Sequence, residues 1–144
     1  SVMDVYSRRV VGWAMDSSMS AQLVVDALEM GLARRRPDEG LIHHSDRGAQ
    51  YVSLIFTTSC KEAGIEASMG AKGCAYDNSA AESFFATLKK DLIHRRSWPT
   101  REEARRAIFD YIEVFYNRKR LHSTLGNLSP EEFEMINQPT AISR

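Results

Sequence analysis

Residues 41–48, Leu-Ile-His-His-Ser-Asp-Arg-Gly, show most plainly which class of fold this chain adopts. Their apolar beginning is typical of a short buried strand over residues 41–44, and a polar turn follows at residues 45–48. Asp46 lies in this turn, directly after the strand. Open α/β sheets usually carry functional groups at such strand ends, so Asp46 is a candidate site residue.

Helical and strand patterns alternate outward from this segment. The apolar residues recur with helical spacing on both sides of it, and Gly64 is a typical signal for the end of the following helix. Strands that come first and then alternate with helices predict the mixed α/β class. The predicted elements are strands at 2–6 and 9–15, a helix from Ser18 or Ser20 to about Arg36, the strand at 41–44, a helix at about 51–63 and a strand at 66–68.

The second half of the chain is predicted to be helical. Asp77 or Asn78 can cap a first helix. Thr100 with Glu103 has the spacing of a capping box, and Ser129, Pro130 and Glu132 open a last short helix in the same way. The residues expected to face inward are Ala81, Phe84, Phe85, Leu88 and Leu92 on the first helix, and Ala104, Ile108, Tyr111, Ile112 and Phe115 on the next.

Composition excludes several classes of protein. The chain has 144 residues, 43% of them hydrophobic, and no apolar run is long enough to span a bilayer. Two cysteines make no disulfide framework and favour a reducing cytoplasm, and the histidines and cysteines lack zinc-finger spacing. The net charge is zero, yet residues 89–122 hold ten Lys and Arg against five Asp and Glu. This basic segment could meet a phosphate backbone, or it could be a solvated helix face.

Two acidic residues stand out by their context. Asp46 follows a predicted strand, and Glu82 lies near the start of a predicted helix beside a glycine-rich loop. Together they could bind hard divalent cations, which take oxygen ligands, and two-metal phosphoryl transfer uses such carboxylates. Each residue alone has an ordinary interpretation: Asp46 as a turn residue, and Glu82 as a partner of the helix dipole.

Lys89 lies seven residues after Glu82. On an α-helix this spacing puts both side chains on one face, about 10 Å apart, whereas Lys90 is offset from that face. A lysine at this position could bind a DNA phosphate. The alternative is an exposed lysine on an amphipathic helix.

Ordered motifs run along nearly the whole chain. They are Val5–Trp13 (VYSRRVVGW), His44–Tyr51 (HSDRGAQY), Tyr76–Lys89 (YDNSAAESFFATLK), Tyr116–Arg118 (YNR) with Arg120, and His122–Ser123 (HS) with Leu125–Gly126 (LG) and Ser129–Pro130 (SP). Taken together and in order, these five motifs resemble the catalytic core of insertion-sequence transposases of the IS three group, which is similar to that of retroviral integrases. The five together are more specific than any one of them.

The resemblance implies a ribonuclease H-like fold: a mixed sheet flanked by helices, over residues 1–136, with a tail at 137–144. It implies a Mg²⁺- or Mn²⁺-dependent enzyme that nicks transposon ends and transfers the freed strand to target DNA. Asp46 and Glu82 would be two of its three carboxylates, each both catalytic and metal-binding. DNA-binding candidates are Lys89, Lys90, Arg118, Arg120 and His122, of which His122 also has a structural interpretation.

The first carboxylate of this family belongs to a central strand upstream of the position of Ser1. We therefore expect the isolated chain to be inactive, with Asp4 and Asp16 as decoys. Alternatives are a catalytically dead DNA-binding or assembly module and, with less support, a cellular ribonuclease H-like nuclease. The expected partners are DNA and other copies of the chain, without a membrane, in the bacterial cytoplasm near the nucleoid.

Overall fold

A computed structural model describes residues 1–45, 50, 53–69 and 76–137 of this chain. These residues form two compact units. The first comprises residues 1–3 and 11–85, and the second comprises residues 4–10 and 86–144, with its last described residue at 137.

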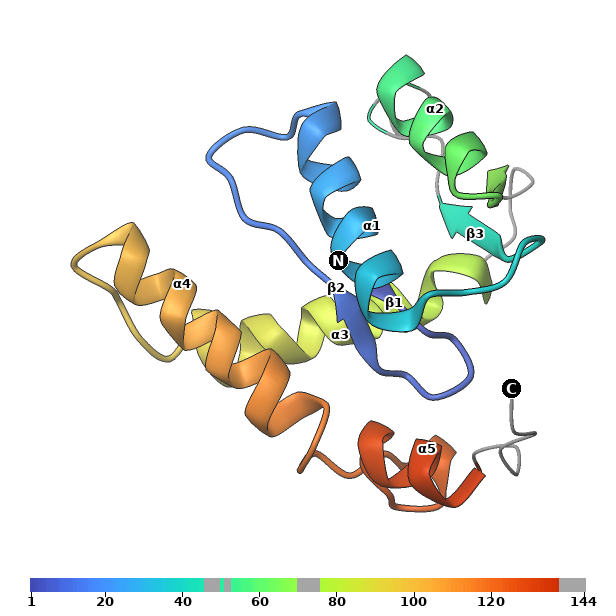
Figure 1. Ribbon diagram of the computed structural model, residues 1–144. Coiled ribbons are helices and arrows are strands. Elements are labelled where there is room, and N and C mark those ends of the chain that lie inside the picture. The colour runs from blue at the N-terminus through green and yellow to red at the C-terminus, as the bar shows by residue number, and fades with distance from the viewer. Residues whose placement is uncertain (46–49, 51–52, 70–75, 138–144) are drawn as a thin grey trace. The chain divides into compact units, whose positions relative to one another are not determined.

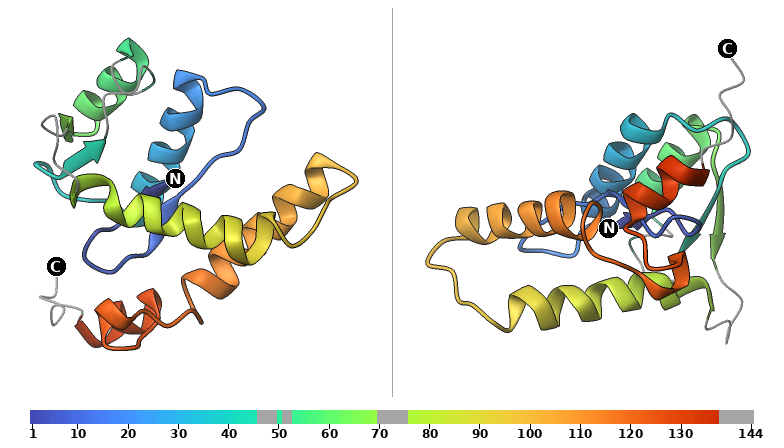
Figure 2. Two further views of the ribbon diagram at one scale, coloured as in Figure 1. Left: turned by 180° about the vertical axis from the view of Figure 1, so that it is seen from behind. Right: turned by 90° about the horizontal axis from the view of Figure 1, so that it is seen from below.

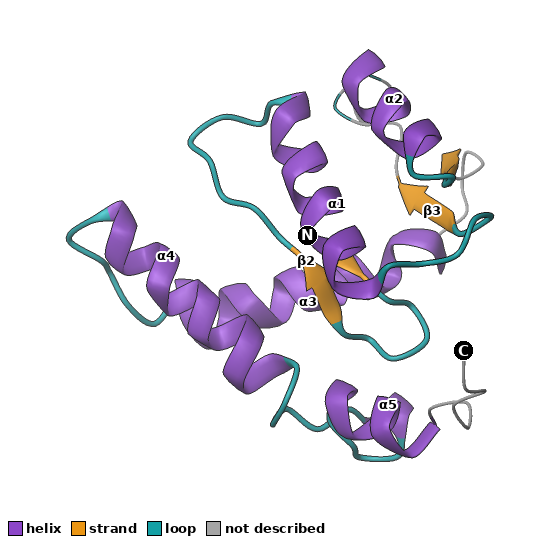
Figure 3. Ribbon diagram, viewed as in Figure 1, coloured by secondary structure: helices purple, strands orange, loops and turns teal. Residues whose placement is uncertain are grey.

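The first unit holds the strands and the first helices (Figures 1 and 3). Strand β3 pairs in parallel with β4, and β1 pairs with β2, as two separate two-stranded sheets among the described residues. The predicted strand at 41–44 is thereby confirmed with a shift of one residue, whereas the strands predicted at 2–6 and 9–15 are much shorter. The elements are β1 (Val2–Met3), β2 (Val10–Gly12), α1 (Ala21–Arg35), β3 (Ile42–Ser45), α2 (Leu54–Glu62), β4 (Glu66–Met69) and α3 (Tyr76–Leu88).

Helix α1 begins and ends as its sequence predicts. The Ser20 hydroxyl accepts a hydrogen bond from the Leu23 backbone N–H (3.3 Å), which satisfies one of the free N–H groups at the helix start. Arg36 ends the helix in a left-handed conformation, and its N–H donates to the Leu32 carbonyl. The helix packs on α2, as Figure 1 shows. The shared apolar core is formed by Val25, Leu28, Phe56, Cys60 and Ile65.

Gly12 determines how closely β2 approaches α1. A Cβ atom at this position would overlap the Ala27 carbonyl oxygen and would lie 2.9 Å from the Gly31 backbone nitrogen. The glycine of the Val-Val-Gly-Trp motif is therefore required because helix backbone occupies the space of a side chain.

The turn between β1 and β2 uses the Asp4 carboxylate. Its Oδ1 atom accepts hydrogen bonds from the Tyr6 and Ser7 backbone N–H groups (2.9 and 3.2 Å). Such a bond pattern closes a turn, which gives Asp4 a structural role.

The second unit is formed mainly by helices. Its elements are η1 (Lys89–Ile93) and η2 (Tyr111–Tyr116), both π-helical, with α4 (Arg101–Asp110), the 3₁₀ turn η3 (Ser123–Leu125) and α5 (Pro130–Asn137). Both views in Figure 2 show the chain leaving η1 and turning back into α4. The Thr100 hydroxyl caps α4 by accepting from the Glu103 N–H (3.2 Å). At α5 the reciprocal capping box forms in full, since Ser129 and Glu132 each accept the other's backbone N–H.

Two inward-facing predictions were wrong. Phe85 is 42% exposed and Phe115 is 40% exposed, whereas the neighbouring Phe84 and Tyr116 are buried. In the π-helix η2 each backbone N–H bonds five residues back, so the buried face advances further along the sequence than 3.6 residues per turn. The buried residue after Ile112 is therefore Tyr116.

The signature motifs at the two ends of the chain meet within the second unit. Asn117, only 1% exposed, pairs with the backbone of Val10: its Oδ1 accepts the Val10 N–H (2.9 Å) and its Nδ2 donates to the Val10 carbonyl (3.0 Å). Glu134 accepts hydrogen bonds from the Ser7 hydroxyl (2.6 Å) and from Arg9 Nη1 (2.9 Å). These contacts explain the Tyr-Ser-Arg-Arg and Tyr-Asn-Arg segments as structural motifs.

Candidate functional site

The predicted acidic site involves residues of the first unit. Asp46 lies outside the described residues, directly after the Ser45 end of β3. Glu82 lies on α3 with an exposed side chain. That the two carboxylates share one metal site therefore stays a prediction.

The surroundings of Glu82 argue against an ordinary helix-dipole role. Helix α3 begins at Tyr76, one or two residues earlier than the predicted caps, so Glu82 lies in the second turn. The helix dipole acts mainly within the first turn, and it gives little reason for an acid at this position. Within the described ranges, Glu82 also has no hydrogen bond or ion pair. Its carboxylate oxygens are consequently available to a ligand.

Lys89 and Lys90 are exposed at the start of η1, in the second unit. The backbone stays helical through Leu88 (φ −58°, ψ −47°), so α3 passes into η1 without a break. Neither ammonium group has an ion pair in the parts of the chain that the structure describes. Both lysines are therefore available to an anion, and their binding of DNA stays a prediction.

The other predicted DNA-binding residues are already engaged with protein groups. Arg118 is exposed and forms an ion pair with Glu131 (3.3 Å). The Arg120 guanidinium lies over the Tyr116 ring, 5.7 Å from its centroid, and 3.3 Å from the Nδ1 atom of His122. His122 is only 9% exposed and packs edge-on against Tyr116.

The electrostatic environment of His122 favours its neutral form. Burial, and then the positive charges of Arg120 and Arg8, lower the pKa of the imidazole to about 4. A neutral, buried ring is a weak ligand for phosphate. The contacts thus support the structural interpretation of His122, and its contact with DNA stays a prediction.

The residues that the sequence analysis missed lie in the second unit. Arg95, Arg96, Arg106 and Trp98 border a pocket between the end of η1 and α4. The signal that could have indicated them is the basic charge of residues 89–122, with a tryptophan close to two adjacent arginines.

Among the described side chains, no group of three or more His, Cys, Asp or Glu is arranged to bind a metal ion. Asp46 is outside the described residues and so is not among these side chains. None of the described helices is long and apolar enough to cross a membrane.

The fold is that of the catalytic core of retroviral integrases. The chain superposes on the catalytic core domain of BIV integrase with a TM-score of 0.68 at 20% identity, covering 94% of this chain and 84% of that one. A second neighbour, from a simian T-cell lymphotropic virus intasome in complex with the PP2A regulatory subunit B56 gamma, gives a TM-score of 0.62 at 13% identity, covering 89% of this chain and 44% of that one. The predicted ribonuclease H-like α/β class is confirmed.

Sequence comparison gives the family. Models described as integrase core domain match residues 1–75 and 82–137, so the chain belongs to the integrase core domain family. It is 48% identical over 136 residues to the transposase InsF of insertion sequence IS3A from Escherichia coli strain K12, and 44% identical over 135 residues to the transposase of element IS904 from Lactococcus lactis. These matches confirm the likeness to the IS three group. They cover 94% of this chain, which spans about half the length of these relatives (47% and 53%).

Proposed function

We propose that this chain is the catalytic core of a bacterial DNA transposase that cuts the ends of a mobile element and transfers the freed strand. The observation that carries the proposal is Glu82. Its carboxylate is exposed in mid-helix, with no partner in the described residues and no part in capping the helix. The membership of the integrase core family supports the same reaction class.

Asp46 and Glu82 are the residues that would hold the metal. Both offer carboxylate oxygens, which fit Mg²⁺ or Mn²⁺ by donor type. When bound, two such ions activate the attacking oxygen and stabilise the leaving one. The protein's own contribution is to fix Glu82 on a helix and Asp46 after a strand, because catalytic groups must be held in place before the reaction.

DNA would be bound by the basic second unit. Lys89 and Lys90 supply ammonium groups without ion pairs in the described regions, which suits contacts to the phosphate backbone. Arg118 could exchange its exposed pair with Glu131 for a phosphate. Arg120 and His122 would act mainly by holding this region in shape. We assign the catalytic core to residues 1–136 and the tail to residues 137–144.

From the family resemblance, we expect the third carboxylate on a strand upstream of the position of Ser1. Two carboxylates hold two hard cations poorly, since each ion takes several oxygen ligands. We therefore propose that the chain alone does not cleave DNA, that it acts within a longer transposase, and that copies of that protein assemble on the two transposon ends. Its place would be the bacterial cytoplasm, at the nucleoid.

The test is cleavage of a transposon-end duplex by the full transposase that contains this chain. Glu82→Gln should lower the cleavage rate by roughly three orders of magnitude or more while DNA affinity stays the same, because only a catalytic ligand is removed. Glu66→Gln is the matched control, since Glu66 is an exposed glutamate on β4, and it should cleave normally. Normal cleavage by Glu82→Gln would overturn the catalytic assignment. A protein that binds DNA but never cleaves it, even unaltered, would favour the DNA-binding module.

A further inference from the structure

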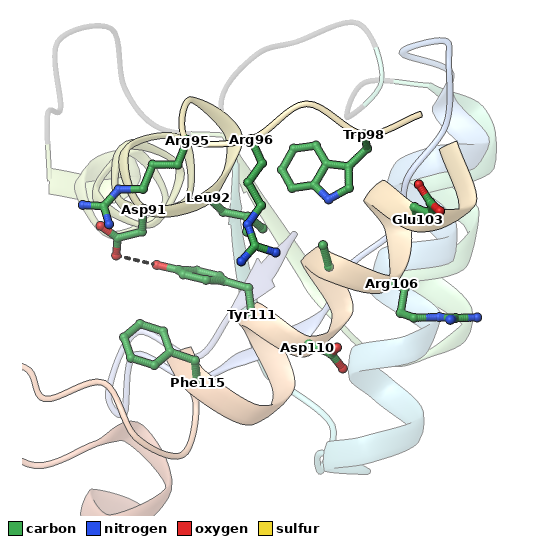
Figure 4. A pocket seen from close by; sticks show the side chains of 11 residues that line it. Asp91, Leu92, Arg95, Arg96, Trp98, Glu103, Arg106, Asp110, Tyr111 and Phe115 are labelled. Carbon is green, nitrogen blue, oxygen red and sulfur yellow. Dashed lines mark hydrogen bonds between the residues drawn. The ribbon is translucent and has the colours of Figure 1, made fainter. Parts of the chain in front are cut away.

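A pocket of about 600 Å³ lies within the second unit, where η1, the following loop and α4 meet (Figure 4). It is an open pocket and not an enclosed cavity. The predicted acidic residues and lysines take no part in it. Its lining includes three arginines, three acidic residues and three aromatic side chains.

Three arginines border the pocket with their charges unpaired. Arg95, Arg96 and Arg106 are exposed, and none of them has an ion pair or hydrogen bond with another side chain in the described part of the protein. Figure 4 shows the Arg96 guanidinium pointing between Trp98 and Tyr111. A planar guanidinium without a carboxylate partner is suited to a phosphate group, which it can bind through two parallel N–H donors.

Trp98 offers an aromatic surface next to these charges. Its indole is only half-buried and lies at the pocket beside Arg96 (Figure 4). An exposed indole face next to guanidinium groups is the combination on which nucleic-acid bases stack while phosphates are neutralised.

The acidic residues of the lining narrow the choice of ligand. Asp91, Glu103 and Asp110 equal the three arginines in number, so the pocket as a whole has no net positive charge. An uninterrupted phosphate backbone would gain little electrostatic attraction from a pocket without net positive charge. A nucleotide carries both a phosphate for arginine and base amino groups that carboxylates accept, and it matches this mixed lining.

The pocket walls are unusual in backbone as well. Two π-helices, η1 and η2, contribute Asp91 and Leu92 on one side and Tyr111 and Phe115 on the other. The Tyr111 hydroxyl donates a hydrogen bond to Asp91 Oδ2 (3.1 Å), which joins the two walls (Figure 4). π-helical residues are well under 1% of residues in soluble proteins, and π-bulges occur frequently at functional sites.

We propose that this pocket binds one unpaired nucleotide of the DNA, with the base stacked on Trp98 and its phosphate bound by Arg96. The inference rests on the proposed function, because it takes DNA as the partner. It adds a position within the second unit at which a splayed or single-stranded nucleotide is held, formed by residues other than the predicted acidic pair. Arg95 and Arg106 stand at the rim, where they can bind the neighbouring phosphates.

The experiment uses Trp98 as its own reporter. The chain has two tryptophans, so Trp13→Phe leaves Trp98 as the only indole, and stacking of a base should quench its fluorescence. The 144-residue chain with this substitution is titrated with a DNA duplex that carries a short single-stranded 3′ overhang, and with a blunt duplex of equal charge. The overhang duplex should quench Trp98 and bind more tightly than the blunt one.

Matched variants distinguish DNA binding at the pocket from non-specific attraction between DNA and the positive charges of the protein. Arg96→Ala should weaken binding of the overhang duplex by about tenfold, the scale of one lost phosphate or stacking contact. Arg101→Ala removes an exposed arginine that does not line the pocket and should leave the affinity nearly unchanged. Trp98→Phe should retain most of the affinity because it keeps an aromatic face.

Three results would overturn the inference: no quenching by either duplex, equal losses for Arg96→Ala and Arg101→Ala, or quenching by an acidic peptide instead of DNA. None of them touches the role of Glu82. If Glu82→Gln abolishes cleavage but DNA does not quench Trp98, the proposed function stands and the pocket assignment fails. If DNA quenches Trp98 but Glu82→Gln still cleaves, the pocket assignment stands and the catalytic assignment of Glu82 fails.

Discussion

Asn117 should be among the most sensitive positions of the chain, because its amide replaces a strand partner for Val10. Asn117→Ala leaves the Val10 N–H and C=O groups, both in a residue of 0% exposure, without these two bonds of 2.9 and 3.0 Å. Each buried group that loses its partner costs about 1–3 kcal/mol, and water entering the vacated space recovers part of it. We expect the free energy of unfolding to fall by about 3 kcal/mol.

The assay is urea unfolding followed by circular dichroism. With a denaturant slope of about 2 kcal/mol per molar, this loss lowers the urea midpoint by about 1.5 M. Asn137→Ala is the control, because Asn137 is exposed at the end of α5 and should change stability by less than about 0.5 kcal/mol. An equally small effect of Asn117→Ala would refute the argument. Asn117→Asp should be worst at neutral pH, where its carboxylate faces the Val10 carbonyl, and should recover as the buried group is protonated.

Two further predictions follow from packing and charge. Gly12→Ala should destabilise the protein by about 1–3 kcal/mol or more, because the added Cβ overlaps the Ala27 carbonyl. Gly31→Ala should cost much less in the same urea assay, because the nearest atom to its added Cβ is a Val11 methyl at 3.3 Å. Equal effects of the two substitutions would contradict the close approach of β2 to α1. An NMR titration should give His122 a pKa near 4. Because this pKa is lowered from 6.5, the stability that the neutral buried ring contributes is complete above pH 6.5 and is lost as pH falls toward 4. An NMR titration midpoint near 6.5 would show that the ring is not buried.

Local signals predicted the helix boundaries well. Ser20 and Ser129 cap their helices as expected, because a serine hydroxyl just before a helix can accept a hydrogen bond from a free backbone N–H group of the first turn. The inward faces were predicted less well. The π-helix at Tyr111–Tyr116 changes the number of residues per turn, so a 3.6-residue period wrongly assigns Phe115 to the interior.

Contacts distant in sequence had no local signal. Asn117 and Val10 are 107 residues apart, and Ser7 and Glu134 are 127 apart. The motifs that contain most of these residues were recognised as a family signature, yet only the structure explains them as structural contacts. For the candidate site, the sequence named Glu82 and the structure adds its exposure in mid-helix. The pocket around Trp98 was missed because its residues share no helical face in sequence.

The proposal that Asp46 and Glu82 together hold one metal site can be tested by a crystal structure with Mn²⁺. The protein should be the transposase core extended upstream of Ser1, with Mn²⁺ located by its anomalous scattering. We expect an ion with a carboxylate oxygen from each residue within about 2.5 Å, the usual range for oxygen ligands of such cations. An ion bound elsewhere, with the two carboxylates more than about 12 Å apart, would contradict the shared site, since no single cation can be coordinated across that distance.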